Sequence, residues 1–387
     1  MADANKRLGI LTGGGDCPGL NAVIRAVAHR CAQKGIELLG YRYGWAGVVA
    51  GDSVVLDRAA VKGILPLGGT ILGTSRTDPL VVPDGIAQIR RTLEADGIDG
   101  LISIGGDGTL SASQELFERG VPLIGVPKTI DNDLCGTDFT FGFDTAVAIA
   151  SEAIDRLHTT AEAHNRVLIV EVMGRHTGWI AAYSGLAGGA DVILVPEYPF
   201  EVEAVCERVR ERERRGRTFS IVVIAEGARP SGADNEIVER RSRVRPGEIS
   251  AWLAREMERC IDTETRTVVL GHIQRGGTPS AHDRVLATRF GVHAADLAIA
   301  GGWGQMVALH GNEIGTVLLA DAVRKLKRLD PAIWDIAKVF TYSAATWRRP
   351  PAATAGGSPP PARPATPARR AAPRQRQPAV PADIQLA

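Results

Sequence analysis

Seven short apolar runs alternate with helical segments along this chain, and each run ends at a polar or glycine-rich loop. The runs are residues 8–11, 101–104, 123–126, 167–170, 192–195, 221–225 and 267–270. Their length and composition predict buried strands, and the apolar spacing of the segments between them is helical. Because parallel strands need crossover connections, the alternation predicts an α/β fold of mainly parallel sheets with flanking helices.

Composition restricts the class of protein. With 387 residues, 44% apolar and 23% charged, the chain is expected to be soluble and globular, which excludes a fibre or a small disulfide scaffold. A formal charge of +1 supplies no general field for nucleic acid or an anionic membrane, so neither partner is expected. Ten of the 22 prolines lie in residues 347–387, which predicts a disordered tail. A basic docking segment is the alternative there.

The five cysteines indicate the cellular compartment. They are odd in number, widely spaced and never in a C-x-x-C pattern, which argues against disulfides and a structural zinc site. The sequence also contains no signal-peptide pattern and no apolar run of about 18 residues. These features predict a cytoplasmic protein.

The loops that follow the predicted strands carry the polar motifs. In parallel sheets ligands bind beyond the carboxyl ends of the strands, so the site is expected there. The glycines of residues 12–16, TGGGD, would let backbone amides approach an anion, although a tight turn explains them equally. In residues 105–109, GGDGT, a carboxylate among amides would repel phosphate unless a cation bridges them. Asp107 therefore predicts a Mg²⁺ ligand beside a polyphosphate, with a helix cap as the alternative.

Two further features suggest phosphoryl transfer to an alcohol. Residues 128–133, KTIDND, supply carboxylates that could accept a hydroxyl proton. Asp131 and Asp133 would point the same way in an extended loop, whereas an Asx turn is the alternative. Arginines are also expected at loops on one edge of the sheet, where their guanidinium groups would bind a substrate phosphate. These are Arg76, Arg166, Arg175, Arg266 and Arg275, the last with His272.

The motifs in their order resemble the 6-phosphofructokinase family. They include LTGGGDCPGLNAVIR, GGTILGTSR, IGGDGT, PKTIDNDL, VEVMGRHTG and VLGHIQRGGTPSAHDR, and the resemblance extends over about residues 7–340. It implies two interleaved Rossmann-like domains. Residues 1–142 and 279–327 would bind the phosphoryl donor, and residues 143–278 and 328–346 would bind fructose 6-phosphate.

The resemblance also implies roles for individual residues. Asp131 matches the general base that deprotonates the 1-hydroxyl of fructose 6-phosphate in this glycolytic reaction, with Arg175 and Arg76 completing the catalytic set. Asp107 matches the Mg²⁺ ligand. The matches to the donor (ATP) site are Gly15, Arg76, Thr77, Gly106, Asp107, Gly108 and Thr109. The matches to the substrate site are Thr129, Asp131, Arg166, Met173, Gly174, Arg175, Glu226, Arg266, His272 and Arg275.

Arg166 and Arg266 match arginines that reach the substrate of a neighbouring subunit. The resemblance therefore implies a homo-oligomer, a dimer or a tetramer, with shared active sites.

Two positions bear on the donor. Family members that use pyrophosphate have Asp at the position of Gly108 and Lys at that of Lys128, whereas typical ATP enzymes have Gly at both. A carboxylate at residue 108 would repel the α-phosphate of a nucleotide, and Lys128 is compatible with either donor. We expect ATP, with pyrophosphate as the alternative. A non-catalytic sensor of sugar phosphates or nucleotides is a third possibility.

Overall fold

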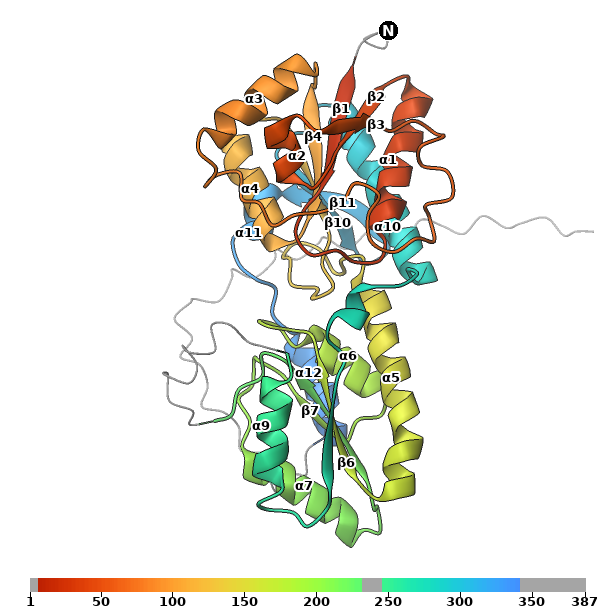
Figure 1. The fold of residues 1–387 in the computed structure, drawn as a ribbon, viewed down its shortest axis with the longest axis vertical. Helices are drawn as coiled ribbons and strands as arrows, with labels where there is room; N and C mark the ends of the chain where they lie inside the picture. Colours follow the sequence, from red (N-terminus) through yellow and green to blue (C-terminus); the bar gives the residue numbers. More distant parts are fainter. Residues whose placement is uncertain (1–5, 232–245, 342–387) are drawn as a thin grey trace, which may run out of the picture. The chain divides into compact units, whose positions relative to one another are not determined.

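The computed structural model describes residues 6–231 and 246–341 and contains two β-sheets (Figure 1). The larger sheet has the strand order β11-β10-β5-β4-β1-β2-β3. Its neighbouring strands are parallel except at the two ends, where β3 and β11 run antiparallel. The bounds are β1 Arg7–Thr12, β2 Glu37–Tyr41, β3 Ser53–Val55, β4 Gly100–Gly105, β5 Leu123–Pro127, β10 Gln305–His310 and β11 Glu313–Leu318.

Helices cover both faces of this sheet. On one face α1 (Leu20–Lys34) packs against α10 (Ala281–Ile299), and both contribute to one apolar cluster with the sheet. On the other face a second cluster joins α2 (Trp45–Ala50), α3 (Gly85–Ala95) and α4 (Asp107–Glu118) to the strands (Figure 1). The short helix α11 (Leu319–Val323) follows β11 and packs on α4.

The smaller sheet is entirely parallel, with the order β7-β8-β6-β9. Its strands are β6 Val167–Val172, β7 Val192–Leu194, β8 Ser220–Ala225 and β9 Thr265–Val269. One face packs against α5 (Phe143–His164), α6 (Trp179–Ala187) and α12 (Pro331–Thr341). The other packs against α7 (Val202–Arg214) and α9 (Glu248–Met257). The 3₁₀ helix η2 (Gly271–Arg275) follows β9.

The structure confirms the predicted α/β class with mainly parallel sheets. All seven apolar runs overlap strands, and six of these strands are almost fully buried, because burial on both faces of a sheet favours continuous apolar sequence. The seventh, β9, lies at the edge of the smaller sheet and has exposed residues, so the expectation of a buried strand is wrong there. The chain returns to the larger sheet through α10, β10 and β11 after it has completed the smaller one. The domain bounds stay a prediction, and the predicted tail, 347–387, lies outside the described residues. None of the described helices combines the length and the apolar composition that a membrane span requires.

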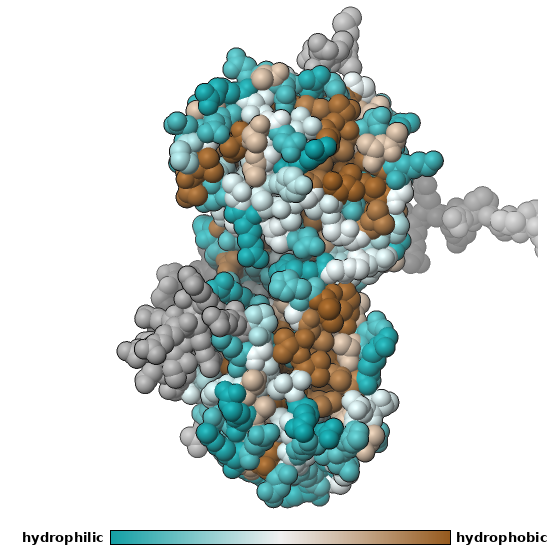
Figure 2. All heavy atoms as spheres, in the orientation of Figure 1, coloured by the Kyte–Doolittle hydropathy of each residue, from teal (hydrophilic) through white to brown (hydrophobic). Residues whose placement is uncertain are grey.

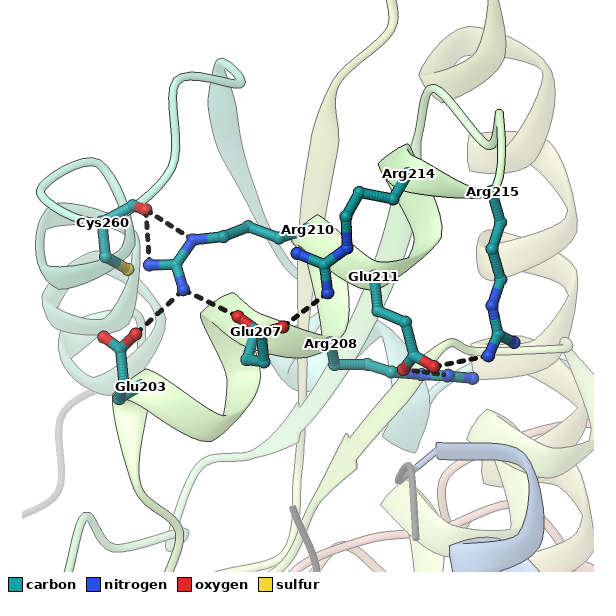
Figure 3. Close-up of polar contacts among 8 residues, drawn as sticks. All are labelled: Glu203, Glu207, Arg208, Arg210, Glu211, Arg214, Arg215 and Cys260. Carbon is teal, nitrogen blue, oxygen red and sulfur yellow. Dashed lines mark hydrogen bonds and ion pairs between the residues drawn. The ribbon is translucent and has the colours of Figure 1, made fainter. Parts of the chain in front are cut away.

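One expectation from the cysteines is wrong. Cys206 of α7 and Cys260, 54 residues apart in sequence, form a disulfide in the structure. Sequence spacing could not show this contact, because the packing of α7 against α9 brings the two residues together. Beside it, the Arg210 guanidinium donates two hydrogen bonds to the Cys260 carbonyl and pairs with Glu203 and Glu207 (Figure 3).

Candidate active site

A cleft of about 390 Å³ lies at the carboxyl ends of β1, β4 and β5. Its size is within the ordinary range of ligand pockets. The residues that line it are Gly14, Gly15, Ser75, Arg76, Thr77, Asp78, Gly106, Asp107, Gly108, Thr109, Lys128, Thr129, Asp131, Asp133 and Arg275. The cleft thus brings together all seven residues predicted for the donor site. From the predicted substrate site it adds Thr129, Asp131 and Arg275.

The glycine loop after β1 is a tight turn that also lines the cleft. Gly14 has a φ of 78°, in the left-handed region that favours glycine. A Cβ on Gly13 would lie 2.7 Å from the side chain of Thr109, so the loop packs closely on the start of α4. The Gly14 amide donates to the Ser75 carbonyl at 2.9 Å, which connects the loop to the segment that carries Arg76. The turn and the anion-binding interpretation are therefore compatible at this loop.

Asp107 opens α4 without capping it. The N-cap residue is Gly106, and no side chain donates or accepts a cap hydrogen bond there, so the capping alternative is wrong. Burial, and then the negative charge of Asp133, raises the pKa of Asp107. A carboxylate whose pKa is raised by a neighbouring carboxylate fits a divalent cation, and Mg²⁺ prefers oxygen ligands. Residues 6–231 and 246–341 contain no group of three or more candidate metal ligands, so phosphate oxygens and water would have to complete the shell.

Asp131 has the electrostatics of a general base. Its Oδ1 atom is buried and has no hydrogen-bond partner among the described residues. Burial, followed by the charge of Asp133, raises the pKa of Asp131 to about 7, while the positive charges of Arg275 and Lys128 act in the opposite direction. A carboxylate with a pKa near neutrality both ionises at physiological pH and accepts a proton readily.

The loop that carries Asp131 is not extended, contrary to the expectation from sequence. Asn132 is fully buried and adopts a φ of 48°, so the backbone departs from the extended conformation between the two aspartates. Asp131 and Asp133 nevertheless both line the cleft. Their convergence comes from this left-handed residue and not from the alternation of an extended segment.

The two donor-specificity positions have different surroundings. A Cβ on Gly108 would meet no atom within 4 Å, so the space beside this residue is open. Lys128 is only 4% exposed, and its Nζ donates to the Gly15 carbonyl. Burial lowers the pKa of Lys128, and the negative charge of Asp131 opposes that effect. Lys128 thus contacts the glycine loop and lies close enough to Asp131 to interact with it electrostatically.

The remaining substrate-site residues follow the strands of the smaller sheet. Gly174, with a φ of 133°, donates its amide to the Glu226 carboxylate, and the Met173 amide donates to Gln274 Oε1 at 3.4 Å. These contacts hold the loops after β6, β8 and β9 together. Arg175 and His272 are exposed and do not line the cleft. Arg275 does, and its Nη1 donates to the Asp16 carbonyl of the glycine loop at 3.3 Å.

Two of the five arginines are not on the expected edge. Arg166 immediately precedes β6 and Arg266 is the second residue of β9, so both lie at the amino ends of their strands. Both pair with Glu264 instead of lining the cleft. The expectation that all five arginines share one edge is therefore wrong, because a position beside an apolar run does not say which end of the strand it occupies.

The cleft also contains residues that the sequence analysis did not select. Gly14, Ser75 and Asp78 line it, and each is within two positions of a selected residue. The signal that could have identified these three residues was their proximity in sequence to the selected ones. Lys327 is a different case, because it contacts the Asp131–Asp138 loop from far along the sequence and no motif marked it.

This chain is similar to several known proteins. The family model described as Phosphofructokinase matches residues 7–298. A pyrophosphate–fructose 6-phosphate 1-phosphotransferase of Streptomyces coelicolor is 57% identical over 86% of this chain and 99% of its own. ATP-dependent 6-phosphofructokinase 3 of the same organism is 54% identical, over 84% and 97%. An ATP-dependent 6-phosphofructokinase of Mycobacterium tuberculosis is also 54% identical, over 86% and 99%.

Solved structures are similar as well. The T-state phosphofructokinase of Pichia pastoris superposes with a TM-score of 0.71 at 33% identity, over 82% of this chain. This chain spans 35% of that longer one. A pyrophosphate-dependent phosphofructokinase of Marinobacter aquaeolei gives a TM-score of 0.75 at 24% identity, over 88% of this chain and 89% of that one. The latter comparison shows the shared fold.

Proposed function

This chain belongs to the phosphofructokinase family, and from that premise we propose that it transfers the γ-phosphoryl group of ATP to the 1-hydroxyl of fructose 6-phosphate. The product is fructose 1,6-bisphosphate. The observation that carries the proposal is the buried, unpartnered Oδ1 of Asp131 in a cleft lined by two glycine loops. Catalysis of this kind depends on positioning and on electrostatic stabilisation of the transferred group.

The chain's own residues divide the work. The Asp131 carboxylate accepts the proton of the attacking hydroxyl, for which its pKa of about 7 is suited. Backbone amides of the glycine loops and the N-terminus of α4 bind the donor phosphates. Arg76, which lines the same cleft, neutralises charge on the phosphoryl group in transit. Thr129 and the residues after β6, β8 and β9 would bind the sugar phosphate, with Arg175 near the reacting groups.

Asp107 would hold Mg²⁺ at the donor phosphates. When bound, the ion neutralises phosphate charge and helps align the donor. Asp133 contributes a second negative charge nearby, as its effect on the pKa of Asp107 indicates.

The open space at Gly108 favours ATP as the donor. A side chain there would meet no protein atom within 4 Å, so a nucleotide can use the volume that a carboxylate would otherwise occupy. Pyrophosphate is the second candidate. Lys128 supports it, because this buried ammonium lies beside the glycine loop and could bind a short inorganic donor. The relative that is 57% identical is named for pyrophosphate.

We also propose a homo-oligomer, a dimer or a tetramer, in which Arg166 and Arg266 reach the substrate of a neighbouring copy. Both side chains are at the strand ends opposite the loops that would bind the sugar in their own subunit. Figure 2 shows apolar residues gathered over α5 and α6, where Val147, Tyr183 and Leu186 are only partly buried. Exposed apolar surface of this kind favours contact with another protein. The cytoplasmic location stays a prediction.

Assaying the purified protein with fructose 6-phosphate and either ATP or pyrophosphate, at matched concentrations with Mg²⁺, tests the proposal. We expect fructose 1,6-bisphosphate with ATP and at most trace product with pyrophosphate. The reverse result would establish the second candidate. Binding of both substrates without product from either donor would instead indicate a non-catalytic sensor.

A further inference from the structure

The ammonium group of Lys327 donates its hydrogen bonds to the loop that carries Asp131, the proposed general base. Its Nζ donates to Asn132 Oδ1 at 3.0 Å and to the carbonyls of Thr137 and Asp138, each at 2.9 Å. A lysine ammonium has three protons, so these three oxygens use all of its donors. Burial lowers the pKa of Lys327 to about 8, which leaves the group protonated at pH 7. The negative charges of Asp138 and Asp133 oppose that effect of burial.

Asn132 is the residue through which this contact reaches the site. It lies between Asp131 and Asp133, is 0% exposed and has a φ of 48°. The left-handed region is sparsely populated by residues other than glycine, although asparagine tolerates it best. Its Oδ1 accepts one hydrogen bond from Lys327 and a second from the Thr140 amide at 3.1 Å. Its Nδ2 donates to the Asp138 carbonyl at 3.4 Å, so Lys327 and the backbone of residues 138–140 together hold the Asn132 side chain.

The backbone of Lys327 provides a second anchor. Its amide donates to the Asp133 carbonyl at 2.7 Å, and its carbonyl accepts from Trp179 Nε1 at 3.1 Å. The ammonium also lies 5.1 Å from the centre of the Trp179 ring, within the range of a cation–π contact. Trp179 is the first residue of α6, directly after the loop that carries Arg175. One lysine thus connects the loop of the general base with the loop expected to bind sugar phosphate.

We propose that Lys327 is a positioning residue for the phosphoryl transfer: by holding Asn132 in its left-handed conformation, it keeps the Asp131 carboxylate directed into the cleft. Lys327 itself is not among the residues that line the cleft. The effect on turnover follows from geometry, since misplacing a reacting group by about 1 Å can cost about 10²-fold in rate.

The kinetic test replaces Lys327 with methionine, which keeps most of the length and removes the three donors. The matched control is Lys325→Met, an exposed lysine two residues earlier. We expect Lys327→Met to lower kcat by about 10- to 100-fold, with both KM values within about threefold, and Lys325→Met to behave as wild type. A folded Lys327→Met protein with wild-type kcat would overturn the inference, as would a loss confined to KM.

The kinetic test of Lys327 rests on the proposed function. A second measurement is therefore needed that does not depend on turnover. Hydrogen exchange at the Thr140 amide reports on Asn132 directly, because that amide donates to Asn132 Oδ1. Lys327→Met should accelerate this exchange and Lys325→Met should not. Unchanged exchange would overturn the positioning role even if the wild type proved inactive. An inactive wild type with accelerated exchange in the variant would instead count against the proposed function alone.

A double-mutant cycle identifies the route of action and covers a failure of Lys327→Met to fold. Asn132→Gly retains access to positive φ and removes the Oδ1 acceptor. Alone, it should lower kcat to about the same extent as Lys327→Met, and the combination should lower it little further. Fully additive losses, or wild-type kcat in Asn132→Gly, would show that Lys327 does not act through Asn132.

Discussion

The loops of the larger sheet and those of the smaller sheet differ in how much of a site this one chain assembles. Every residue predicted to bind the donor follows β1, β3 or β4 and lines a single cleft. Of the ten predicted substrate-site residues, only three line it, and Arg166 and Arg266 lie at the opposite strand ends. A phosphate can be held by contiguous backbone amides, whereas a sugar phosphate needs side chains from several separate strands.

The largest expected effect comes from Asp131, where the donor site and the sugar-phosphate site are expected to meet. Asp131→Asn should lower kcat by about 10²- to 10⁴-fold, because it removes the proton acceptor. Steady-state kinetics with saturating donor and sugar would measure this. Near-normal turnover would exclude Asp131 as the general base.

The same variant has a stability control. The pKa of Asp131 in the folded state is about 7, above its usual 3.8. The wild type therefore loses folding stability as the pH rises from 3.8 towards 7. This loss is complete above pH 7 and smaller at pH 5. Asp131→Asn should therefore raise the melting temperature at pH 8 and by a smaller amount at pH 5. A lower melting temperature at pH 8 would show that the loss of turnover includes damage to the fold.

A carboxylate at residue 108 should affect the donor site alone. Gly108→Asp introduces a side chain into open space, so the fold is expected to tolerate it. Repulsion between like charges should then lower kcat/KM for ATP by about 10²-fold. The KM for fructose 6-phosphate should stay unchanged, and Gly108→Asn is the uncharged control. An equal loss of apparent affinity for ATP and for fructose 6-phosphate would contradict the division into a donor site and a sugar-phosphate site.

Removing the Arg266 side chain should affect the sugar-phosphate site alone. It should also reveal whether active sites are shared between subunits. Loss of a charged contact to phosphate predicts a rise of about 10- to 100-fold in the KM for fructose 6-phosphate. Co-expressing Arg266→Ala with Asp131→Asn should restore activity at low fructose 6-phosphate concentrations, because a mixed oligomer would have sites that combine the intact Asp131 of one subunit with the intact Arg266 of the other. The absence of any restored activity in isolated mixed oligomers would argue against shared sites.

The smallest effect expected is on pH dependence. The base must be ionised, so kcat/KM should fall about tenfold between pH 8 and pH 6, given a pKa of about 7 for Asp131. The residual turnover of Asp131→Asn should lack this acidic limb. The same limb in both proteins would assign the titration to another group, such as a substrate phosphate.

Prediction from sequence succeeded where the physical requirement is local. The strands were recognisable because two-sided burial demands continuous apolar runs, but β2, β3, β10 and β11 were missed. Of these, β3 and β11 are edge strands with partly exposed residues, which weakens the apolar signal. Asp107 and the two glycine loops could be assigned to the cleft from sequence because each belongs to a contiguous motif directly after a strand.

Other parts of the site depend on segments that are distant in sequence. Lys327 and Asn132 are 195 positions apart, and the pairing of Cys206 with Cys260 needed the packing of two helices. The near-neutral pKa of Asp131 arises from burial and from neighbours on other loops. The order of residues along the chain thus established which chemical groups are available and which strands they follow. Packing established how deeply each group is buried, which way it faces and which charges surround it, because these properties depend on contacts between distant segments.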